Sequence, residues 1–386
     1  MEHNKIMDCR ELATLVKDQV KEYVDDIKNN GIPVPKLVCI QVGKMGASSL
    51  YVGNKKKACE YCGAQFEVFN LNEETTTTET LIHLIQYLNN DQTVHGIFVQ
   101  YPLPEHIDPN VVQFISPLKD VDCFTAINVG AISIDMTKTS MIPCTVGGIY
   151  QLLRSTVGDI AGKHCVVIGR SNIVGKPMAS VLTQMDATVT LCHSKTKNLA
   201  SHLLNADIII SAVGKPKFIN HYMVKEGAII IDVGINKDEN GKTCGDVEVT
   251  DELLEKVEWV TPVPRGVGQL TVSTLMSNLI RAHANQMYDY YNLTNQQVQE
   301  ESYEETSQPD DVEEVQVEVI PPSDQLIKED EVIDFPQDGE IIVEGKENGD
   351  VVVDSIEDDT IHLKIRDIDN SANDENISVT ELKERY

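Results

Sequence analysis

Apolar and polar residues alternate with two different periods along the first 290 residues of the chain. Apolar side chains at helical spacing predict a first helix over 9–30, which ends at an Asn-Asn-Gly stop signal. Three short apolar runs and two further helical patterns follow it. The strands are predicted over 36–43 (KLVCIQVG), 65–71 (QFEVFNL) and 95–104 (HGIFVQYPLP), and the helices over 48–63 and 81–90. This alternation indicates βαβ units and a parallel sheet.

A loop-rich stretch over 117–130 (PLKDVDCFTAINVG) interrupts the alternation, which starts again near residue 147. Helices are then predicted over 147–155, 175–182 and about 268–288, and strands over 164–169, 187–194, 206–214 and 228–236. We therefore expect an α/β protein of two domains, residues 1–144 and 145–267. The closing helix, about 268–288, is expected to return to the first domain and complete it.

The formal charge of −29 is unevenly distributed. Residues 287–386 carry 30 acidic and 6 basic side chains, whereas residues 1–286 carry 31 and 26, so an acidic tail (289–386) follows a nearly neutral body. The body lacks the basic stripe of a nucleic-acid binder, and the tail would repel phosphates. No apolar run approaches the roughly 18 residues of a membrane span, and the N-terminus lacks a targeting segment. We expect a cytoplasmic protein that binds neither nucleic acid nor membrane.

Nine cysteines are scattered through the body, several of them within apolar strands. Their odd number and positions favour free thiols in a reducing compartment. Cys59 and Cys62 form a C-x-x-C pair, but the pair falls late in a helix, away from the N-terminal end that activates redox thiols. No second pair stands at zinc spacing. We expect these two cysteines to be packing residues, and we expect no metal site.

The predicted helix over 48–63 has an unusual polar face. Ser48, Tyr51 and Lys55 stand three and four residues apart and so share one side, with Lys57 towards the flank. A solvated surface lysine is the ordinary interpretation of any single Lys. A hydroxyl, a phenol and an amine together on one face also fit a helix that looks into a cleft.

The sequence VVIGRSNIVGKP places a tight turn after a strand and before a helix, where the pyrophosphate of a dinucleotide binds to backbone N–H groups. It departs from G-x-G-x-x-G, because Ser171 stands at the middle glycine and Gly175 comes one residue late. The next strand ends in Cys-His-Ser-Lys, without the acid that holds the ribose of NAD. Together with Arg170, this favours the 2′-phosphate of NADP. A degenerate fold that binds no nucleotide is the alternative.

Polar or Gly/Pro-rich segments also follow the other predicted strands, at 99–102, 120–122, 232–236 and 261–268. Ligands of open α/β sheets bind outside the carboxyl ends of the strands. Ordinary turn chemistry could explain any one of these segments but explains the whole set poorly.

Nine collinear motifs resemble the bifunctional methylenetetrahydrofolate dehydrogenase/methenyltetrahydrofolate cyclohydrolase family over about residues 8–285. They are Ser48-x-x-Tyr51-x-x-x-Lys55-x-Lys57-Ala58, VHGIFVQYPLP, KDVD, IPCT, GRSNIVGKPM, TVTLCHSKT, DVGIN, GDV and TPVPRGVG. The resemblance implies a folate-binding N-terminal domain, a Rossmann-type NADP domain, a cleft between them and a homodimer.

Site residues follow from the same resemblance, position by position. Lys55 would be the catalytic lysine, Tyr51 would stack on the folate ring, Gln100 would hydrogen-bond Lys55, and Asp122 would hold the pterin edge. Further substrate-binding residues would be Ser48, Val99, Tyr101, Pro264, Gly266, Val267, Gly268 and Thr271. The NADP-binding residues would be Gly169, Arg170, Ser171, Ile173, Ser194 and Ile235.

The implied reactions are NADP-dependent oxidation of 5,10-methylenetetrahydrofolate and hydrolysis of the methenyl product to 10-formyltetrahydrofolate, in one-carbon metabolism and purine biosynthesis. The first reaction needs mainly orientation, and the second needs proton transfer by a group such as Lys55.

The sequence departs from the family pattern at Cys123, Val146, Arg265 and Gln269. Arg265 matters most, because a glycine position often requires a positive φ or a close approach to a ligand. Arg265 could crowd the pocket, or pair with the folate glutamate or the cofactor. Two alternatives therefore stay open: a binding protein without turnover, and an NAD-linked enzyme with dehydrogenase activity only.

The acidic tail lies outside the resemblance. The first part of the tail, 295–318, is polar and is predicted to be disordered. Alternating apolar residues around Asn348-Gly349, with a further run at 360–368, indicate a small β-module. The tail could bind a partner, whose nature the sequence does not indicate.

Overall fold

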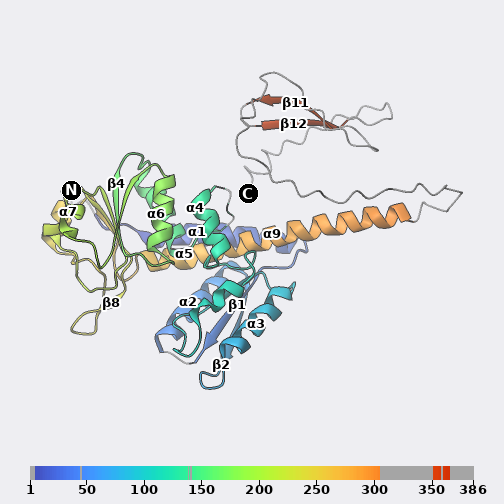
Figure 1. The fold of residues 1–386 in the computed structure, drawn as a ribbon, viewed down its shortest axis with the longest axis horizontal. Coiled ribbons are helices and arrows are strands. Elements are labelled where there is room, and N and C mark those ends of the chain that lie inside the picture. Colours follow the sequence, from blue (N-terminus) through green and yellow to red (C-terminus); the bar gives the residue numbers. More distant parts are fainter. Residues whose placement is uncertain are drawn as a thin grey trace, which may run out of the picture. The chain divides into compact units, whose positions relative to one another are not determined.

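The computed structural model describes residues 5–43, 46–137, 139, 141–304, 351–357 and 360–365, with backbone only for 46–50 and beyond 287. The chain divides into two compact units, Met1–Gln308 and Pro309–Tyr386, and each is considered by itself. The first unit holds two parallel sheets (Figure 1). We call the part built on the first sheet (5–134, with the last helix) the first lobe, and residues 144–266 the second lobe.

The first lobe is organised around a three-stranded parallel sheet in the order β2-β1-β3. The central strand is buried over six of its seven residues, as expected for a strand covered on both faces. The elements are α1 (Cys9–Asn29), β1 (Lys36–Val42), α2 (Gly46–Cys62), β2 (Gln65–Leu71), α3 (Thr78–Asn90), β3 (Gly96–Val99) and the 3₁₀ turn η1 (Pro109–Phe114). Side-chain caps by Asp8 and Thr77 start α1 and α3.

The second lobe carries a five-stranded parallel sheet in the order β10-β7-β6-β4-β5. Its central strands are continuous apolar runs and are buried throughout. The elements are α5 (Cys144–Leu152), the π turn η2 (Leu153–Val157), β4 (His164–Ile168), α6 (Gly175–Gln184), β5 (Thr188–Cys192), α7 (Leu199–Leu203), β6 (Ile208–Ser211), η3 (His221–Met223), β7 (Ile229–Asp232), the hairpin β8 (Asn236–Lys237) and β9 (Thr243–Cys244), α8 (Asp251–Lys256) and β10 (Trp259–Val260).

The last helix, α9 (Val267–Glu304), leaves the second lobe and runs back along the first (Figure 1). It packs against α1, α2 and β3 of the first lobe and against α5 of the second. Leu270, Leu275, Met276 and Leu279 are fully buried in this packing. The helix therefore contacts both lobes, and the predicted α/β class with parallel sheets is confirmed.

The structure adds helical segments that the sequence analysis did not predict in two places. The stretch 117–130 is not loop throughout, because α4 (Ala126–Ile134) begins within it, with Thr125 capping its first turn. This helix is apolar on most sides, so its sequence shows no helical periodicity from which it could be predicted. Residues 295–304 were predicted to be disordered but continue α9, since Gln and Glu propagate a helix well and no Gly or Pro stands among them. The rest of the region predicted to be disordered lies outside the described residues.

In the second unit, β11 (Val351–Glu357) and β12 (Thr360–Ile365) pair antiparallel. The strand expected before the Asn348-Gly349 turn lies outside the described residues.

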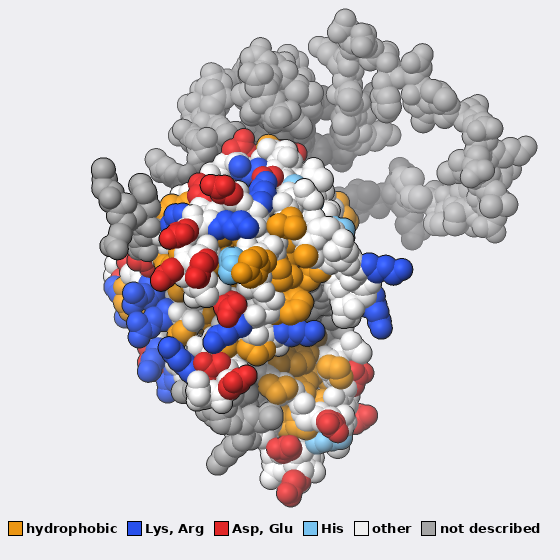
Figure 2. Space-filling model, turned by 90° about the vertical axis from the view of Figure 1, so that its left-hand side faces the viewer, with side chains coloured by type: hydrophobic (Ala, Val, Ile, Leu, Met, Phe, Trp, Pro, Cys, Tyr) orange, Lys and Arg blue, Asp and Glu red, His pale blue; other side chains and the backbone are white. Residues whose placement is uncertain are grey.

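The surface of the second lobe bears both signs of charge. Figure 2 shows acidic and basic side chains interspersed over this face, with a group of basic ones at its left edge. Within the part of the chain that the structure describes, no helix is both long enough and apolar enough to cross a membrane.

Candidate active site

Helix α2 places two of the predicted catalytic side chains. Its cysteines Cys59 and Cys62 are buried in the core, where burial raises the pKa of the Cys62 thiol to about 11. The polar side carries Lys55, whose side chain is only 14 % exposed. The Lys55 Nζ lies 3.7 Å from the centroid of the Phe98 ring and 3.8 Å from Asp122 Oδ2. By contrast, the neighbouring Lys56 is solvated and pairs with Glu60.

The loop after β3 holds Asp122 by means of a second, buried carboxylate. Asp120 accepts hydrogen bonds from the backbone N–H groups of Phe124 and Thr125 and from the Asn128 amide. Burial raises the pKa of Asp120. With Asp120 fixing the loop, Asp122 points towards Lys55, and the Cys144 thiol donates to its Oδ1 over 3.6 Å. The two acids of KDVD thus differ in role, one structural and one facing the site.

Gln100 presents an acceptor that lacks a partner. Its Nε2 donates to the Tyr101 carbonyl oxygen over 2.8 Å, which fixes the orientation of the amide. Its Oε1 is buried and has no hydrogen-bond partner among the described residues. The predicted bond between Gln100 and Lys55 is therefore not formed in this structure, although both residues line the same cavity. Burial also raises the pKa of Tyr101, to about 12.

A cavity of about 560 Å³ brings these groups together between the two lobes. Its described lining comes from α2, from the strand ends of the first lobe, and from the turn before α6 in the second. The lining residues are Tyr51, Lys55, Gln100, Tyr101, Pro109, Asn110, Val112, Gln113, Asp122, Phe124, Cys144, Thr145, Asn172, Ile173, Val174 and Thr271. We call this space the lysine cavity.

A second cavity, of about 770 Å³, lies on the other side of Tyr51. It is bounded by α1 and α2, by the end of β7 and the β8–β9 hairpin, and by the loop into α9. Its described lining is Lys17, Tyr51, Asn54, Lys57, Ala58, Tyr61, Asp232, Val233, Gly234, Ile235, Asn236, Lys237, Thr243, Pro262, Val263, Pro264, Arg265, Gly266, Val267, Gly268, Gln269 and Val272. We call it the cationic cavity.

The predicted substrate residues divide between these spaces. Thr271 lines the lysine cavity, and Pro264, Gly266, Val267 and Gly268 line the cationic cavity. Val99, the last residue of β3, is instead buried in the core and lines neither cavity. The side chain of Ser48 is outside the described part of the chain.

The turn from β4 into α6 forms a glycine cradle. Gly169 has a φ of +119°, and a Cβ there would collide with the Ala212 carbonyl oxygen. A Cβ on Gly175 would collide with the Gly169 carbonyl oxygen. Ser171 Oγ accepts from the N–H groups of Val174 and Gly175 and so holds the turn before α6. The sequence predicted such a close backbone turn, which suits the approach of a pyrophosphate.

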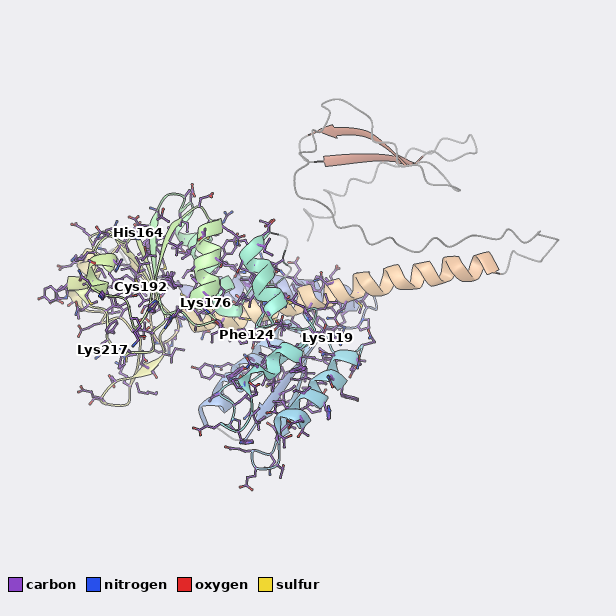
Figure 3. The ribbon with its side chains drawn as sticks, in the orientation of Figure 1. Lys119, Phe124, His164, Lys176, Cys192 and Lys217 are labelled. Carbon is purple, nitrogen blue, oxygen red and sulfur yellow. The ribbon has the colours of Figure 1, made fainter. Side chains whose placement is uncertain are left out.

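The loop after β5 carries cationic and hydroxyl side chains at the same edge of the sheet. Cys192 ends β5 (Figure 3), and Ser194 and Lys195 follow it, both exposed. Arg170 is exposed in the neighbouring turn, since β4 and β5 pair in parallel. No acid stands between residues 193 and 197.

Two buried aspartates fix the remaining strand ends of the second lobe. Asp246 accepts from Ser211 Oγ, from the N–H groups of Val213 and Lys215, and from the Asn236 amide. Asp232 accepts from three backbone N–H groups, and burial, partly opposed by these bonds, raises its pKa to about 6. The pair therefore braces the segment that holds Ile235, and the sequence alone did not reveal it.

Two departures from the family pattern occupy strained backbone. Cys123 has a φ of +59° and Arg265 a φ of +75°, a region that L side chains rarely adopt. The positive φ that the sequence analysis considered for position 265 is present, and Cys123 shares this conformation. Sequence reasoning missed Phe98, Cys144 and Asn278 as site neighbours, because only the tertiary fold brings them to Lys55 and Asp122.

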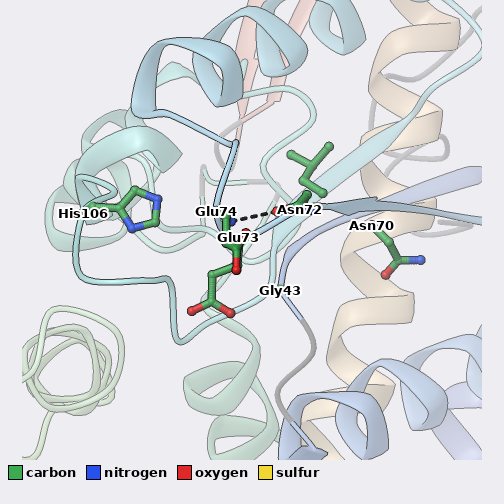
Figure 4. Close-up of a pocket in the computed structure, with 7 residues that line it drawn as sticks. Gly43, Asn70, Asn72, Glu73, Glu74 and His106 are labelled. Carbon is green, nitrogen blue, oxygen red and sulfur yellow. Dashed lines mark hydrogen bonds between the residues drawn. The ribbon is translucent and has the colours of Figure 1, made fainter.

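A larger cavity, of about 890 Å³, lies at the ends of β1 and β2, away from these groups (Figure 4). It is lined by Gly43, Asn70, Leu71, Asn72, Glu73, Glu74 and His106. Its local bond joins Glu74 N–H to Asn72 Oδ1, and no lysine or arginine stands among its described lining. Its acidic character makes it a poorer site for an anionic substrate.

Comparisons with known proteins agree with this geometry. Residues 7–122 match the catalytic-domain model, and residues 143–287 the NAD(P)-binding-domain model, of tetrahydrofolate dehydrogenase/cyclohydrolase. The bifunctional protein FolD of Lachnoclostridium phytofermentans is 50 % identical over 276 residues, which cover 71 % of this chain and 96 % of the relative. FolD of Agathobacter rectalis is 50 % identical over 278 residues, or 72 % and 98 %.

Solved structures give the same result. The bifunctional enzyme FolD from Campylobacter jejuni is 43 % identical, with a TM-score of 0.70 over 73 % of this chain and 99 % of that one. The Trypanosoma brucei dehydrogenase-cyclohydrolase, complexed with NADP and an inhibitor, is 35 % identical, with a TM-score of 0.70 over 74 % and 99 %. The chain therefore belongs to the tetrahydrofolate dehydrogenase/cyclohydrolase family.

Proposed function

We propose that the protein oxidises 5,10-methylenetetrahydrofolate to 5,10-methenyltetrahydrofolate with NADP and then hydrolyses this product to 10-formyltetrahydrofolate. The carrying observation is that Lys55, Asp122 and Gln100 open into one cavity, which the turn at 172–174 of the second lobe also lines. The relatives named as bifunctional support both activities. The product, 10-formyltetrahydrofolate, is a one-carbon donor. The protein would therefore act in one-carbon metabolism and supply formyl groups for purine biosynthesis.

The second lobe fits NADP in two respects. The glycine cradle at Gly169 and Gly175 leaves no room for side chains where a pyrophosphate would approach backbone N–H groups. The exposed Arg170, Ser194 and Lys195 offer cationic and hydroxyl donors for a 2′-phosphate, with no acid to hold the ribose of NAD. Gly169, Arg170, Ser171, Ile173, Ser194 and Ile235 would hold the cofactor.

For the oxidation, the work of this chain is placement. NADP, when bound, takes a hydride from the one-carbon bridge of the folate. Tyr51 stacks on the folate ring, and Asp122, held by the Asp120 network and by Cys144, takes the pterin edge. Ile173 and Thr271 close the cavity on the side of the second lobe. Fixing the two reactants in this way removes much of the entropic barrier.

For the hydrolysis, Lys55 moves the protons. Water adds to the amidinium carbon, one C–N bond breaks, and the released nitrogen gains a proton. Lys55 Nζ accepts one proton of the attacking water and returns it to the released nitrogen, and the second proton of that water leaves to solvent as the formyl C=O forms. Proton transfer of this kind contributes about 10²–10⁴-fold in rate. Asp122 and the Phe98 ring hold the ammonium form in place. The unpartnered Gln100 Oε1 supplies an acceptor for Lys55 during this cycle.

The remaining parts of the proposal concern assembly and location. We place the protein in the cytoplasm, because all nine cysteines are free and eight of them are buried. A homodimer is supported by β5, an edge strand with unpaired backbone groups along one side. The acidic tail would bind a further partner through its charge.

A spectrophotometric assay tests the proposal. Methylenetetrahydrofolate is supplied with NADP or with NAD, and the formation and decay of the methenyl product are followed. The proposal requires fast formation with NADP and catalysed decay. Accumulation of the methenyl compound without catalysed decay would favour an enzyme with dehydrogenase activity only, and a preference for NAD would remove the 2′-phosphate argument. No turnover with either cofactor would favour a binding protein.

A further inference from the structure

The cationic cavity gathers four basic side chains from four different segments. Lys17 comes from α1, Lys57 from α2, Lys237 from β8 and Arg265 from the loop before α9. These segments are far apart in the sequence, so the cluster is a product of the fold. It stands out in a body whose acidic side chains outnumber the basic ones.

No exposed acid neutralises this cluster within the described lining. The one acidic residue there is Asp232, which is only 2 % exposed. Both of its oxygens accept hydrogen bonds from backbone N–H groups. The Asp232 carboxylate therefore stabilises the backbone of the loop, and the charged side chains that the cavity presents to a ligand are basic.

Three of the four basic groups make no hydrogen bond or ion pair within the described part of the chain. Lys17 lies over the Tyr61 ring and Lys237 donates to Thr243, but neither Lys57 nor Arg265 makes a hydrogen bond or ion pair with a described residue. Lysines elsewhere on the same two helices do pair, Lys21 with an acid on α1 and Lys56 with one on α2. Lys57 and Arg265 are therefore available to a ligand that enters the cavity.

Arg265 reaches the cavity at the expense of backbone strain. Its φ of +75° lies where L side chains are disfavoured, and the next residue, Gly266, packs so tightly that a Cβ would collide with the Pro262 carbonyl oxygen. Strained residues cluster at ligand sites, so the strain at Arg265 agrees with a binding role but does not establish one, since Lys217 has a positive φ outside this cavity. A glycine at position 265 would satisfy the same backbone without strain.

Tyr51 connects this cluster to the substrate. It lines both the lysine cavity and the cationic cavity, and it is 44 % exposed. A folate whose ring lies against Tyr51 and Lys55 carries its glutamate at the far end. Each further glutamate joined through a γ-peptide bond adds one carboxylate, so a longer chain matches a larger set of cations.

We infer that the cationic cavity binds the glutamyl chain of the folate substrate, and that Arg265 makes the protein selective for chains with more than one glutamate. This inference rests on the proposed function, because it places the folate ring in the lysine cavity. Lys57 and Lys17 take the first carboxylates, and Arg265 and Lys237 take those beyond. The rival reading assigns Arg265 to a phosphate of NADP, because Ile235 borders the same cavity.

The test compares tetrahydrofolate carrying one and five glutamates, in equilibrium binding by calorimetry and in KM for the methylene derivatives. The variant is Arg265→Gly, which removes the cation and relieves the strain. Lys217→Gly is the matched control, since Lys217 is also an exposed cation at positive φ, 54°, but lies outside the cavity lining (Figure 3). The native protein should bind the longer substrate about tenfold more tightly, and high salt should remove this preference.

In Arg265→Gly, the preference for the longer chain should fall about fivefold, whereas Lys217→Gly should keep the full preference. Equal binding of the two chain lengths by the native protein would overturn the inference, even with turnover intact. A weaker affinity for NADP in Arg265→Gly, with the chain-length preference unchanged, would overturn it in favour of the cofactor. If the native protein turned over neither substrate, the proposed function would fail. The calorimetric comparison of the two chain lengths would still decide the inference.

Discussion

Asn278 on α9 ties the returning helix to the candidate site. Its Nδ2 donates to the carbonyl oxygens of Val121 and Ile142, each over 2.8 Å, and the residue is fully buried. Val121 precedes Asp122, and Ile142 lies shortly before Cys144, whose thiol contacts Asp122. Replacing Asn278 with Leu keeps a similar volume but removes both bonds, so that the Ile142 carbonyl loses this donor and the Val121 carbonyl keeps only the weak Cys144 thiol donor.

The expected cost of Asn278→Leu follows from those bonds. Each lost bond that leaves a buried partner unsatisfied costs about 1–2 kcal/mol, so the free energy of unfolding should fall by about 2–4 kcal/mol. The KM for methylenetetrahydrofolate should rise several-fold, because Asp122 loses its support. Urea unfolding followed by circular dichroism and steady-state kinetics measure the two effects.

Thr274→Val is the control for this measurement. Thr274 lies one turn earlier on α9 and is buried, and its Oγ1 has no partner among the described residues. Removing that hydroxyl breaks no bond and removes a buried unpaired polar group, so the free energy of unfolding should not fall. The reasoning fails if Asn278→Leu costs no more than Thr274→Val and leaves KM unchanged.

Three further predictions concern pH, packing and charge. Burial and the neighbouring His283 lower the pKa of His95 to about 4, so its contribution to stability is present above pH 6.5 and is lost as the pH falls towards 4. From pH 7 to 5 the native protein should lose about 2 kcal/mol more than His95→Gln in urea unfolding, and equal losses would refute this. Gly175→Ala should cost about 1–3 kcal/mol and weaken NADP binding in calorimetry, because its Cβ meets the Gly169 carbonyl oxygen; native affinity would contradict the cradle. Asp246→Asn turns an NH₂ group towards backbone N–H donors, so the free energy of unfolding should fall by about 1–3 kcal/mol and Tm should fall with it in calorimetry. An unchanged Tm would show that the network is dispensable.

The regular elements were predictable because their sequence patterns are strong. Strands such as 208–211 and 229–232 are continuous apolar runs, and the 36–43 run became a central strand as expected. Helix α4 escaped prediction since its residues are apolar on nearly every side and give no period. The extension of α9 to Glu304 was not predictable from hydrophobicity, because a polar, acidic stretch is typical both of disorder and of an exposed helix.

The candidate site was predictable only in part. Tyr51, Lys55, Gln100 and Asp122 were expected to meet, and the structure places all four in the lining of one cavity. Their roles remain predictions, as does the domain boundary near residue 144. The contacts that shape the site join residues far apart in the chain, such as Asn278 with Val121, and no local pattern signals them. The division of the cleft at Tyr51 and the gathering of cations beside it also depend on the fold alone.

The central claim is that one cavity carries both reactions and that Lys55 performs the hydrolysis. Progress curves with methylenetetrahydrofolate and NADP test it most directly in Lys55→Met, which keeps the apolar stem against Phe98 but removes the amine. Lys56→Met is the matched control, an adjacent lysine that is solvated and pairs with Glu60. The account predicts that Lys55→Met still forms the methenyl product but slows its hydrolysis by about 10²–10⁴-fold, so that this product accumulates. Hydrolysis at the native rate in Lys55→Met, equal to that of Lys56→Met, would contradict it.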